Sequence, residues 1–253
     1  MRLLVVAALL LGSAAVAKDP PSTSPPGIVP AVAVNDRPAE AIALDLGRKP
    51  AQVLKFLGLK RGDRVLDLMT GNGYYAEIIG NAIGSYGTVL AEEPTGFTTD
   101  KSRANFAALT KRVPNVTMLE GPIADFDPPA NNFDFTLMHL VFHDLYWSSV
   151  KPDFPATDPS AFLKRLFVAT KPGGIVGVVD HVAALGGDTR AVVDKLHRID
   201  PEVVKADFAR AGFKLEAESD LLHVPADDHS LLVFDKAVRG HTDRFVMRFR
   251  KPA

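Results

Sequence analysis

Residues 65–75, Val-Leu-Asp-Leu-Met-Thr-Gly-Asn-Gly-Tyr-Tyr, constrain the fold more than any other stretch of the chain. A short apolar run, suited to a buried parallel strand, leads into a turn that carries Gly71 and Gly73. From Ala76 onward the pattern predicts a helix, whose free N–H groups point back at the turn. A strand, a glycine turn and a helix in this order form the nucleotide-binding unit of doubly wound α/β folds.

Two kinds of ligand compete for this unit. Gly71-x-Gly73-x-x-Ala76 matches the G-x-G-x-x-A pattern of dinucleotide sites. Asp67, however, ends the predicted strand, and its charge would repel a diphosphate there. The same carboxylate would attract a cationic ligand, directly or through water. Asp67 therefore disfavours an NAD-type oxidoreductase, while an ordinary turn in an α/β protein stays open as the simpler interpretation.

Residues 67–73, Asp-Leu-Met-Thr-Gly-Asn-Gly, resemble the D-x-G-x-G-x-G motif of class I S-adenosylmethionine-dependent methyltransferases. Met69 departs from the motif, because it stands where the first glycine is expected. The resemblance implies S-adenosylmethionine as the cofactor. The residues expected to bind it are Asp67, Met69, Thr70, Gly71, Gly73, Glu93 and Ile123.

Glu93 and Ile123 follow from the next two predicted strands. An acid about 20 residues beyond the glycine turn is placed to hold the ribose hydroxyls; Glu93 is the first choice and Glu92 the alternate. Pro122 occupies the place where many methyltransferases have an acid for the adenine amino group. Adenine would then need backbone contacts near Ile123, or Asp125.

The strand and helix patterns predict a Rossmann-like, doubly wound α/β fold. We expect a seven-stranded, mostly parallel sheet with an antiparallel last strand and helices on both faces. The last two strands are predicted at residues 214–219 and 243–250. Their connection, residues 220–242, is long for a hairpin, which is typical of a functional insertion or a surface flap.

The candidate catalytic residues follow the fourth and fifth predicted strands, at the edge where open α/β sheets bind ligands. His143 is the candidate general base, with Asp144 to orient it, although a histidine that only holds a loop is an equal alternative. His181 ends the next strand on the same side. Tyr146, His197 and Arg198 are candidates for substrate contact. No metal site is predicted, because no histidines show a compact ligand spacing. The alternative is a site assembled from distant segments, since His143, Asp144, Asp180 and His181 could converge at one sheet edge.

Residues 1–17 resemble a secretory signal peptide with cleavage after Ala17, which predicts an exported, periplasmic protein without stable membrane insertion after cleavage. Residues 18–35 are predicted to be a Pro-rich flexible tether and residues 36–253 one methyltransferase-like domain. The net charge of -1 does not favour nucleic acid as a partner, so we expect a small-molecule substrate. The oligomeric state is left open.

The resemblance extends over residues 48–252. The chain is most similar to a group of exported predicted bacterial methyltransferases of unknown substrate, on motifs that include residues 71–75, 196–201 and 239–246. This implies methyl transfer to a small-molecule O or N nucleophile. Because Met69 and Pro122 depart from the family pattern, an exported, non-catalytic ligand-binding protein on the same fold is the alternative.

Overall fold

The computed structural model describes residues 27–151 and 153–253. Seven strands form one sheet in the order β3-β2-β1-β4-β5-β7-β6. All pairs from β3 to β5 are parallel, and β7 runs antiparallel to both β5 and β6. The predicted mostly parallel sheet with an antiparallel last strand is confirmed. The strands are β1 Arg64–Leu68, β2 Thr88–Pro94, β3 Val116–Gly121, β4 Phe133–His139, β5 Thr170–His181, β6 Lys214–Ser219 and β7 Arg244–Arg250.

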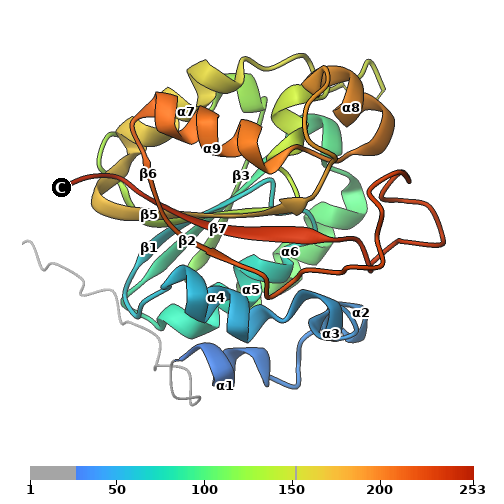
Figure 1. Cartoon of the computed structure of the whole chain (residues 1–253). Helices are drawn as coiled ribbons and strands as arrows, with labels where there is room; N and C mark the ends of the chain where they lie inside the picture. Colours follow the sequence, from blue (N-terminus) through green and yellow to red (C-terminus); the bar gives the residue numbers. More distant parts are fainter. Residues whose placement is uncertain (1–26, 152) are drawn as a thin grey trace, which may run out of the picture.

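Helices cover both faces of the sheet, as predicted (Figure 1). One face carries α1 Ile28–Val32, α4 Pro50–Leu57, α5 Tyr74–Ile83 and α6 Asp100–Arg112, and the other carries α7 Pro159–Ala169 and α9 Pro201–Ala211. The remaining helical segments are α2 Ala39–Ile42, α3 Asp45–Arg48, α8 Thr189–Leu196, η1 Thr95–Phe97, η2 Ile123–Asp125 and η3 His143–Tyr146.

Two apolar cores lie on opposite sides of the sheet. Val65 of β1 packs with α4 and α5, whereas its neighbour Leu66 packs with α7 and α9. This alternation is the period-2 geometry of a strand, and it explains why β1 reads as a continuous apolar run. Packing on both faces holds β1 in the middle of the molecule, and the turn that follows Leu68 lies at the carboxyl edge of the sheet.

The predicted tether ends earlier than expected. Ile28–Val32 forms α1, and Ala31 is buried against the core that contains α5. Apolar Ile28, Ala31 and Val32 gain more from packing on α5 than the preceding Pro- and Ser-rich composition suggested. The predicted signal peptide and residues 18–26 of the tether lie outside the described residues. None of the helices in the described part of the chain is long and apolar enough to span a membrane.

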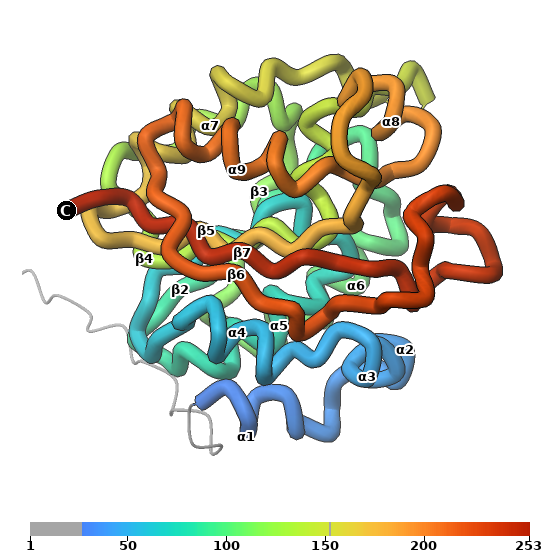
Figure 2. Tube along the Cα trace, viewed as in Figure 1, coloured from blue at the N-terminus to red at the C-terminus, as the bar shows by residue number. Residues whose placement is uncertain are grey.

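The 220–242 insertion forms a loop of turns at the carboxyl edge of the parallel strands, immediately before β7 (Figure 2). Leu222 and Val233 bury their side chains, so the loop is packed onto the domain at two points. Because β7 runs antiparallel to its neighbour β6, the chain returns from β6 at the same edge that carries the glycine turn, and this places the insertion there. A short turn could join two such strands, so the topology does not require the length of the insertion.

Candidate active site

The turn between β1 and α5 has three residues with positive φ: Met69 at 49°, Gly71 at 62° and Gly73 at 77°. Glycine adopts this conformation at no steric cost, but a methionine does not. Met69 is nevertheless accommodated, because its side chain is buried in the core on the α7 and α9 face. The departure from the glycine motif therefore changes the core under the turn, and does not place the Met69 side chain in the crevice.

The two glycines of the turn serve different needs. A Cβ on Gly73 would lie 2.6 Å from Leu109 and 3.2 Å from Phe106, so Gly73 allows α6 to pack closely. No heavy atom lies within 4 Å of a Cβ built on Gly71. Gly71 is therefore the position at which a ligand can approach the backbone. Gly73 is required for helix packing, and its contact with the cofactor stays a prediction.

Three acids surround the turn, and all three are buried: Asp67, Glu92 and Glu93. Glu93 accepts the Gly71 N–H at 2.7 Å, and Glu92 accepts the Met69 N–H at 3.1 Å. Thr70 donates its hydroxyl to Asp67 at 2.6 Å, which gives the predicted residue Thr70 a role within the turn. The carboxylates of β1 and β2 thus fix the shape of the turn by accepting hydrogen bonds from the N–H and hydroxyl groups of the turn.

Burial raises the pKa of Asp67 to about 7 and that of Glu93 to about 7. Burial, together with the charges of Glu93 and Asp67, raises the pKa of Glu92 to about 8. Desolvation and like-charge crowding both disfavour the ionised carboxylates. A cation bound beside these groups would relieve the crowding, so the cluster is electrostatically suited to a cationic ligand.

Asp67 lies deeper than the sequence suggested. Its exposed fraction is 3%, and besides Thr70 it accepts a backbone hydrogen bond from Ala76 in the first turn of α5. The expectation that Asp67 meets the ligand directly is corrected: its carboxylate caps the start of α5 and supports the turn. Its charge still acts at short range in this low-dielectric environment.

Arg48 is a member of the site that the sequence did not identify. Its guanidinium lies 4.4 Å from the centre of the Tyr74 ring, and its charge acts on both Asp67 and Tyr75. Tyr75 is buried, and its hydroxyl has no hydrogen-bond partner among the described residues. A cation and an unpaired hydroxyl behind the acidic turn provide groups for a ligand carboxylate. A basic residue before a predicted helix gave no signal for this role.

Ile123 begins η2 after β3, and its side chain is buried in the core. Only its backbone is available to an adenine ring, as expected from Pro122. Asp125, the alternative, is exposed, and its backbone N–H is bonded to the Pro122 carbonyl. The adenine contacts therefore stay a prediction.

On the acceptor side, Asp180 holds His143 by two hydrogen bonds. The His143 Nδ1 lies 2.8 Å from one Asp180 oxygen, and the His143 backbone N–H donates to the other at 2.9 Å. The predicted orienting residue was Asp144, so this assignment is corrected to Asp180. Asp180 comes from β5 and meets η3 because β4 and β5 are neighbours in the sheet.

The charge state of His143 differs from that of a general base. Burial opposes its charged form, but Asp180 and Asp144 outweigh burial and raise its pKa to about 9. An imidazolium at neutral pH donates protons and does not accept them. The prediction that His143 is the base is therefore not supported in this arrangement, although its position after β4 is as expected.

Asp144 and His197 complete the cluster around His143. One Asp144 oxygen lies 3.4 Å from His143 Nε2 and 3.9 Å from His197 Nδ1. His197 follows α8 with a φ of 49°, and its ring contacts Trp147 and Phe234. The predicted substrate residue His197 is thus brought to the predicted catalytic pair from more than 50 residues away in the chain.

His181 lies beside this cluster, with its ring centre 6.0 Å from that of His143. Its Nδ1 is 2.7 Å from the Thr242 hydroxyl, at the end of the insertion. Burial lowers the pKa of His181 to about 3, partly opposed by Asp180, so its imidazole is neutral. His181 stays a predicted site residue, positioned by Thr242.

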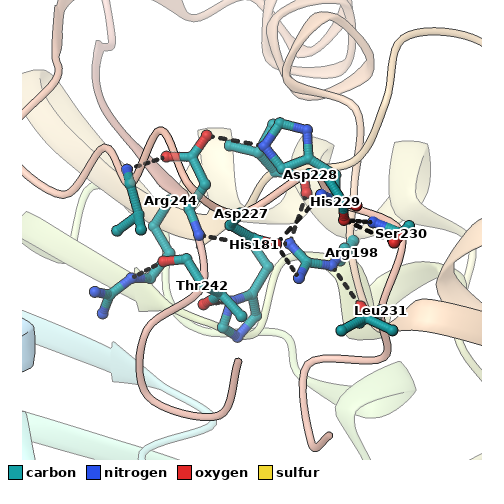
Figure 3. A network of polar contacts seen from close by, with 12 residues as sticks. His181, Arg198, Asp227, Asp228, His229, Ser230, Leu231, Thr242 and Arg244 are labelled. Atoms are coloured by element: carbon teal, nitrogen blue, oxygen red, sulfur yellow. Dashed lines mark hydrogen bonds and ion pairs between the residues drawn. The ribbon is translucent and has the colours of Figure 1, made fainter. Parts of the chain in front are cut away.

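Arg198 is not a substrate-binding residue in this structure. Its side chain is fully buried and pairs with Asp227 of the insertion at 2.9 and 3.0 Å, as Figure 3 shows. It also donates to the carbonyl groups of Leu231 and Val182. The guanidinium therefore anchors the insertion to the domain. The sequence assigned it no structural duty because its partner lies 29 residues away.

Tyr146 is likewise committed to the protein. Its hydroxyl donates to Asp207 of α9, and Arg190 lies over its ring. A hydroxyl used in this way is not free for a substrate, so the predicted contact is limited to the ring. As with Arg198, the residue that pairs with Tyr146 is distant in the sequence, so the sequence alone did not reveal the pairing.

The family model for protein-L-isoaspartate(D-aspartate) O-methyltransferase matches residues 48–122, the region from α3 to the end of β3. A protein-L-isoaspartate O-methyltransferase from Ignicoccus hospitalis is 33% identical over 126 residues, which is 50% of this chain and 51% of that protein. The chain thus spans about half the length of this curated relative.

Solved structures match over most of the chain. An S-adenosylmethionine-dependent methyltransferase from Aquifex aeolicus has a TM-score of 0.58 at 19% identity, covering 84% of this chain and 97% of the other. One from Mesorhizobium loti has a TM-score of 0.58 at 16% identity, covering 82% and 99%. The chain has the class I S-adenosylmethionine-dependent methyltransferase fold. For a class I methyltransferase fold, these matches and the family model imply S-adenosylmethionine as the cofactor.

Proposed function

We propose that this protein transfers the methyl group of S-adenosylmethionine to an oxygen or nitrogen of a small molecule. The observation that carries the proposal is the meeting of two groups of residues at one edge of the sheet. Glu93 and Gly71 lie at the carboxyl ends of β2 and β1, and His143 and Asp144 follow β4. Asp144 lies near enough to Glu93 for its charge to contribute to the raised pKa of Glu93.

The acidic turn suits the donor. S-adenosylmethionine supplies a methyl group on a positively charged sulfur, and the acceptor displaces the sulfur in line. The negative charges of Asp67 and Glu93 favour such a cation, and the open space at Gly71 admits it to the backbone. One oxygen of Glu93 accepts the Gly71 N–H, and the other would accept a ribose hydroxyl in the role expected from the sequence.

The residues on the acceptor side would align the nucleophile and exclude water. Alignment of two reactants contributes several kcal/mol to a displacement, about 7–11 in favourable intramolecular cases. His143 is fixed by Asp180, and the aromatic rings of Trp147 and Phe234 bracket His197. This rigid, partly apolar surface is suited to a small molecule.

Calorimetry with S-adenosylmethionine tests the donor half of the proposal. We expect saturable binding by the wild-type chain, and binding at least tenfold weaker in Glu93→Gln, which keeps the shape but removes the charge. Glu120→Gln is the matched control, because Glu120 lies beside Glu93 on β3 but pairs with Arg103 in solvent. Absence of binding by the wild-type protein, or equal binding by all three, would refute the cofactor assignment.

Transfer itself is tested with methyl-labelled donor and a panel of small hydroxyl and amine compounds. Label should appear in an acceptor only when the Glu93 carboxylate is present. Label in no acceptor, despite tight donor binding, would favour the second candidate below.

The second candidate is an exported protein that binds a ligand on this fold without methyl transfer. Its support is Met69 in place of the first glycine, Pro122 in place of an acid, and the predicted signal peptide. A solved structure described as the [4+2]-cyclase SpnF, with a TM-score of 0.56 and 20% identity over 85% of this chain and 82% of the other, indicates that the fold serves other reactions. Mass spectrometry of small molecules extracted from the exported protein tests this candidate.

A further inference from the structure

Two histidines and one aspartate converge on the acceptor side from separate segments. His143 and Asp144 come from η3, and His197 follows α8. One ligand atom from each residue lies within 4.8 Å of the other two, and no other group of three does so among the described residues. We propose that His143, Asp144 and His197 bind a divalent transition-metal ion.

The distances are close to those of a metal site. Ligands about 2.1 Å from a tetrahedral ion lie about 3.4 Å from one another. His143 Nε2 and the Asp144 oxygen are already 3.4 Å apart, and His197 Nδ1 is 3.9 Å from that oxygen. The ligand atoms of His143 and His197 are at most 4.8 Å apart. His197 therefore needs to move inward by about 0.5 Å toward Asp144 and by up to about 1.4 Å toward His143, which is a side-chain adjustment.

Asp180 supplies the outer contact that metal-binding histidines characteristically have. Its carboxylate is hydrogen-bonded to His143 Nδ1 at 2.8 Å, and Asp180 is itself fully buried. A carboxylate on one ring nitrogen fixes the ring and presents the other nitrogen to the ion. The ion would displace the proton that the second nitrogen of His143 carries at neutral pH, so its affinity should rise with pH. The second hydrogen bond, from the His143 backbone to Asp180, locks the residue itself in place. Asp180 is not one of the three proposed ligands, so its two hydrogen bonds to His143 are evidence separate from the short distances between the ligand atoms.

The environment of His197 restricts its ring as well. The ring centre lies 5.4 Å from that of Trp147 and 5.1 Å from that of Phe234. A left-handed backbone at His197, with φ of 49°, turns its side chain from the end of α8 toward Asp144. Non-glycine residues adopt this conformation in only a few per cent of cases, with asparagine, aspartate and histidine the commonest among them, and it persists where surrounding contacts require it.

The donor set selects the kind of ion. Two imidazoles and one carboxylate suit Zn²⁺, Fe²⁺ or Co²⁺, whereas Mg²⁺ and Ca²⁺ prefer sites made of oxygen. Three protein ligands leave coordination positions open. Resting on the proposed methyl transfer, the ion would bind the acceptor through its oxygen or nitrogen, which makes a hydroxyl or amine compound able to coordinate a metal the expected substrate class.

The test uses the full, untagged chain after removal of metal with a chelator. Calorimetric titration with Zn²⁺ should give one site with micromolar or tighter affinity, and Co²⁺ should give a visible absorption band from nitrogen and oxygen coordination. Mg²⁺ should bind at least tenfold more weakly than Zn²⁺. Each readout is independent of enzyme activity.

Substitutions locate the site. Asp144→Asn and His197→Gln should each weaken Zn²⁺ binding more than tenfold, and Asp180→Asn should weaken it about tenfold through His143. His223→Ala is the matched control, because His223 is also a histidine paired with an aspartate, Asp243 at 2.9 Å, but lies in the insertion. Thermal unfolding of each variant checks that the fold is retained. His197→Gln is the safest variant, because His197 is the most exposed of the three ligands, at 16%.

The outcomes separate this inference from the proposed function. Zn²⁺ binding that is lost in the Asp144 and His197 variants but kept in His223→Ala supports the site, whether or not S-adenosylmethionine binds. Failure of Zn²⁺ and Co²⁺ to bind, or binding unaffected by the Asp144 and His197 variants, overturns it. If the protein binds neither ion but still binds S-adenosylmethionine, the metal proposal fails and the assignment of S-adenosylmethionine as the methyl donor stands.

Discussion

The Glu93 carboxylate accepts the Gly71 N–H at 2.7 Å, so the end of β2 determines the shape of the turn after β1. The two residues are 22 positions apart and meet only because β1 and β2 are parallel neighbours. The acid expected to hold the ribose therefore also holds the glycine loop. Ligand binding and loop geometry depend on the same buried charge.

The first prediction concerns the pH dependence of donor binding. The pKa values of Asp67 and Glu93 are each about 7, so both acids gain protons as the pH falls from 8 to 6. A cation binds the ionised form better, so S-adenosylmethionine affinity should fall over this interval, by up to about tenfold per pH unit for each coupled group. Calorimetry at pH 6, 7 and 8 measures the slope, and Glu93→Gln should reduce it. An affinity that does not change with pH would contradict the acidic cluster as the cation site.

A second prediction concerns stability and Glu92. Its pKa is about 8 in the folded protein and near 4.5 when unfolded, so the folded state binds the proton more tightly. This contribution to stability is present at low pH and is lost as the pH rises through 8. Glu92→Gln should therefore raise the free energy of unfolding at pH 9, by on the order of 2 kcal/mol, with little change at pH 5.

Urea unfolding of wild type and Glu92→Gln at both pH values measures this difference. Glu40→Gln is the control, because Glu40 is exposed in α2 and should show no pH-dependent difference. A Glu92→Gln protein that is less stable than wild type at pH 9 would contradict the buried charge.

A third prediction uses the backbone of Met69. Both Met69→Ala and Met69→Gly remove a buried side chain and should destabilise the protein by about 2–4 kcal/mol. In most positions the glycine variant is the less stable of the two. Because φ at Met69 is 49°, the order should invert, with glycine more stable than alanine by about 1 kcal/mol. Urea unfolding of the pair measures the order, and the usual order would mean that the turn relaxes in solution.

The fourth prediction concerns the buried pair Arg198–Asp227. Arg198→Ala leaves the Asp227 carboxylate without its partner and should cost about 3–5 kcal/mol. Hydrogen exchange should increase in residues 220–242, since this pair anchors that loop. Arg239→Ala, at an exposed position of the same loop, is the control and should change neither quantity. Unchanged exchange in Arg198→Ala would show that Leu222 and Val233 suffice to hold the insertion.

The sequence predicted well wherever the signal is local. The glycine turn, the strand before it and the seven strand segments along the chain follow from periodicity and turn chemistry between neighbouring residues. Met69 was correctly recognised as a departure. Its consequence was not predicted, because whether its side chain enters the crevice or the core depends on a backbone angle that the residue type alone does not give.

Residue roles failed where the partner is distant in the chain. Arg198 was assigned to the substrate because no nearby residue explained it, and the structure pairs it with Asp227. Tyr146 was assigned as an aromatic wall at the sheet edge, and the structure pairs its hydroxyl with Asp207. His143 was expected to accept a proton, but Asp180, 37 residues away, changes its charge. A polar side chain without a local partner is therefore weak evidence for ligand contact.

The sequence by itself determined the α/β class, the sheet edge that carries the site and the family resemblance, because strand alternation and glycine turns are set by residues close together in the chain. Only the tertiary structure decided which buried groups share a proton or charge. The pKa of each carboxylate and imidazole here depends on desolvation and on partners brought together by neighbouring strands, as when β5 places Asp180 beside His143.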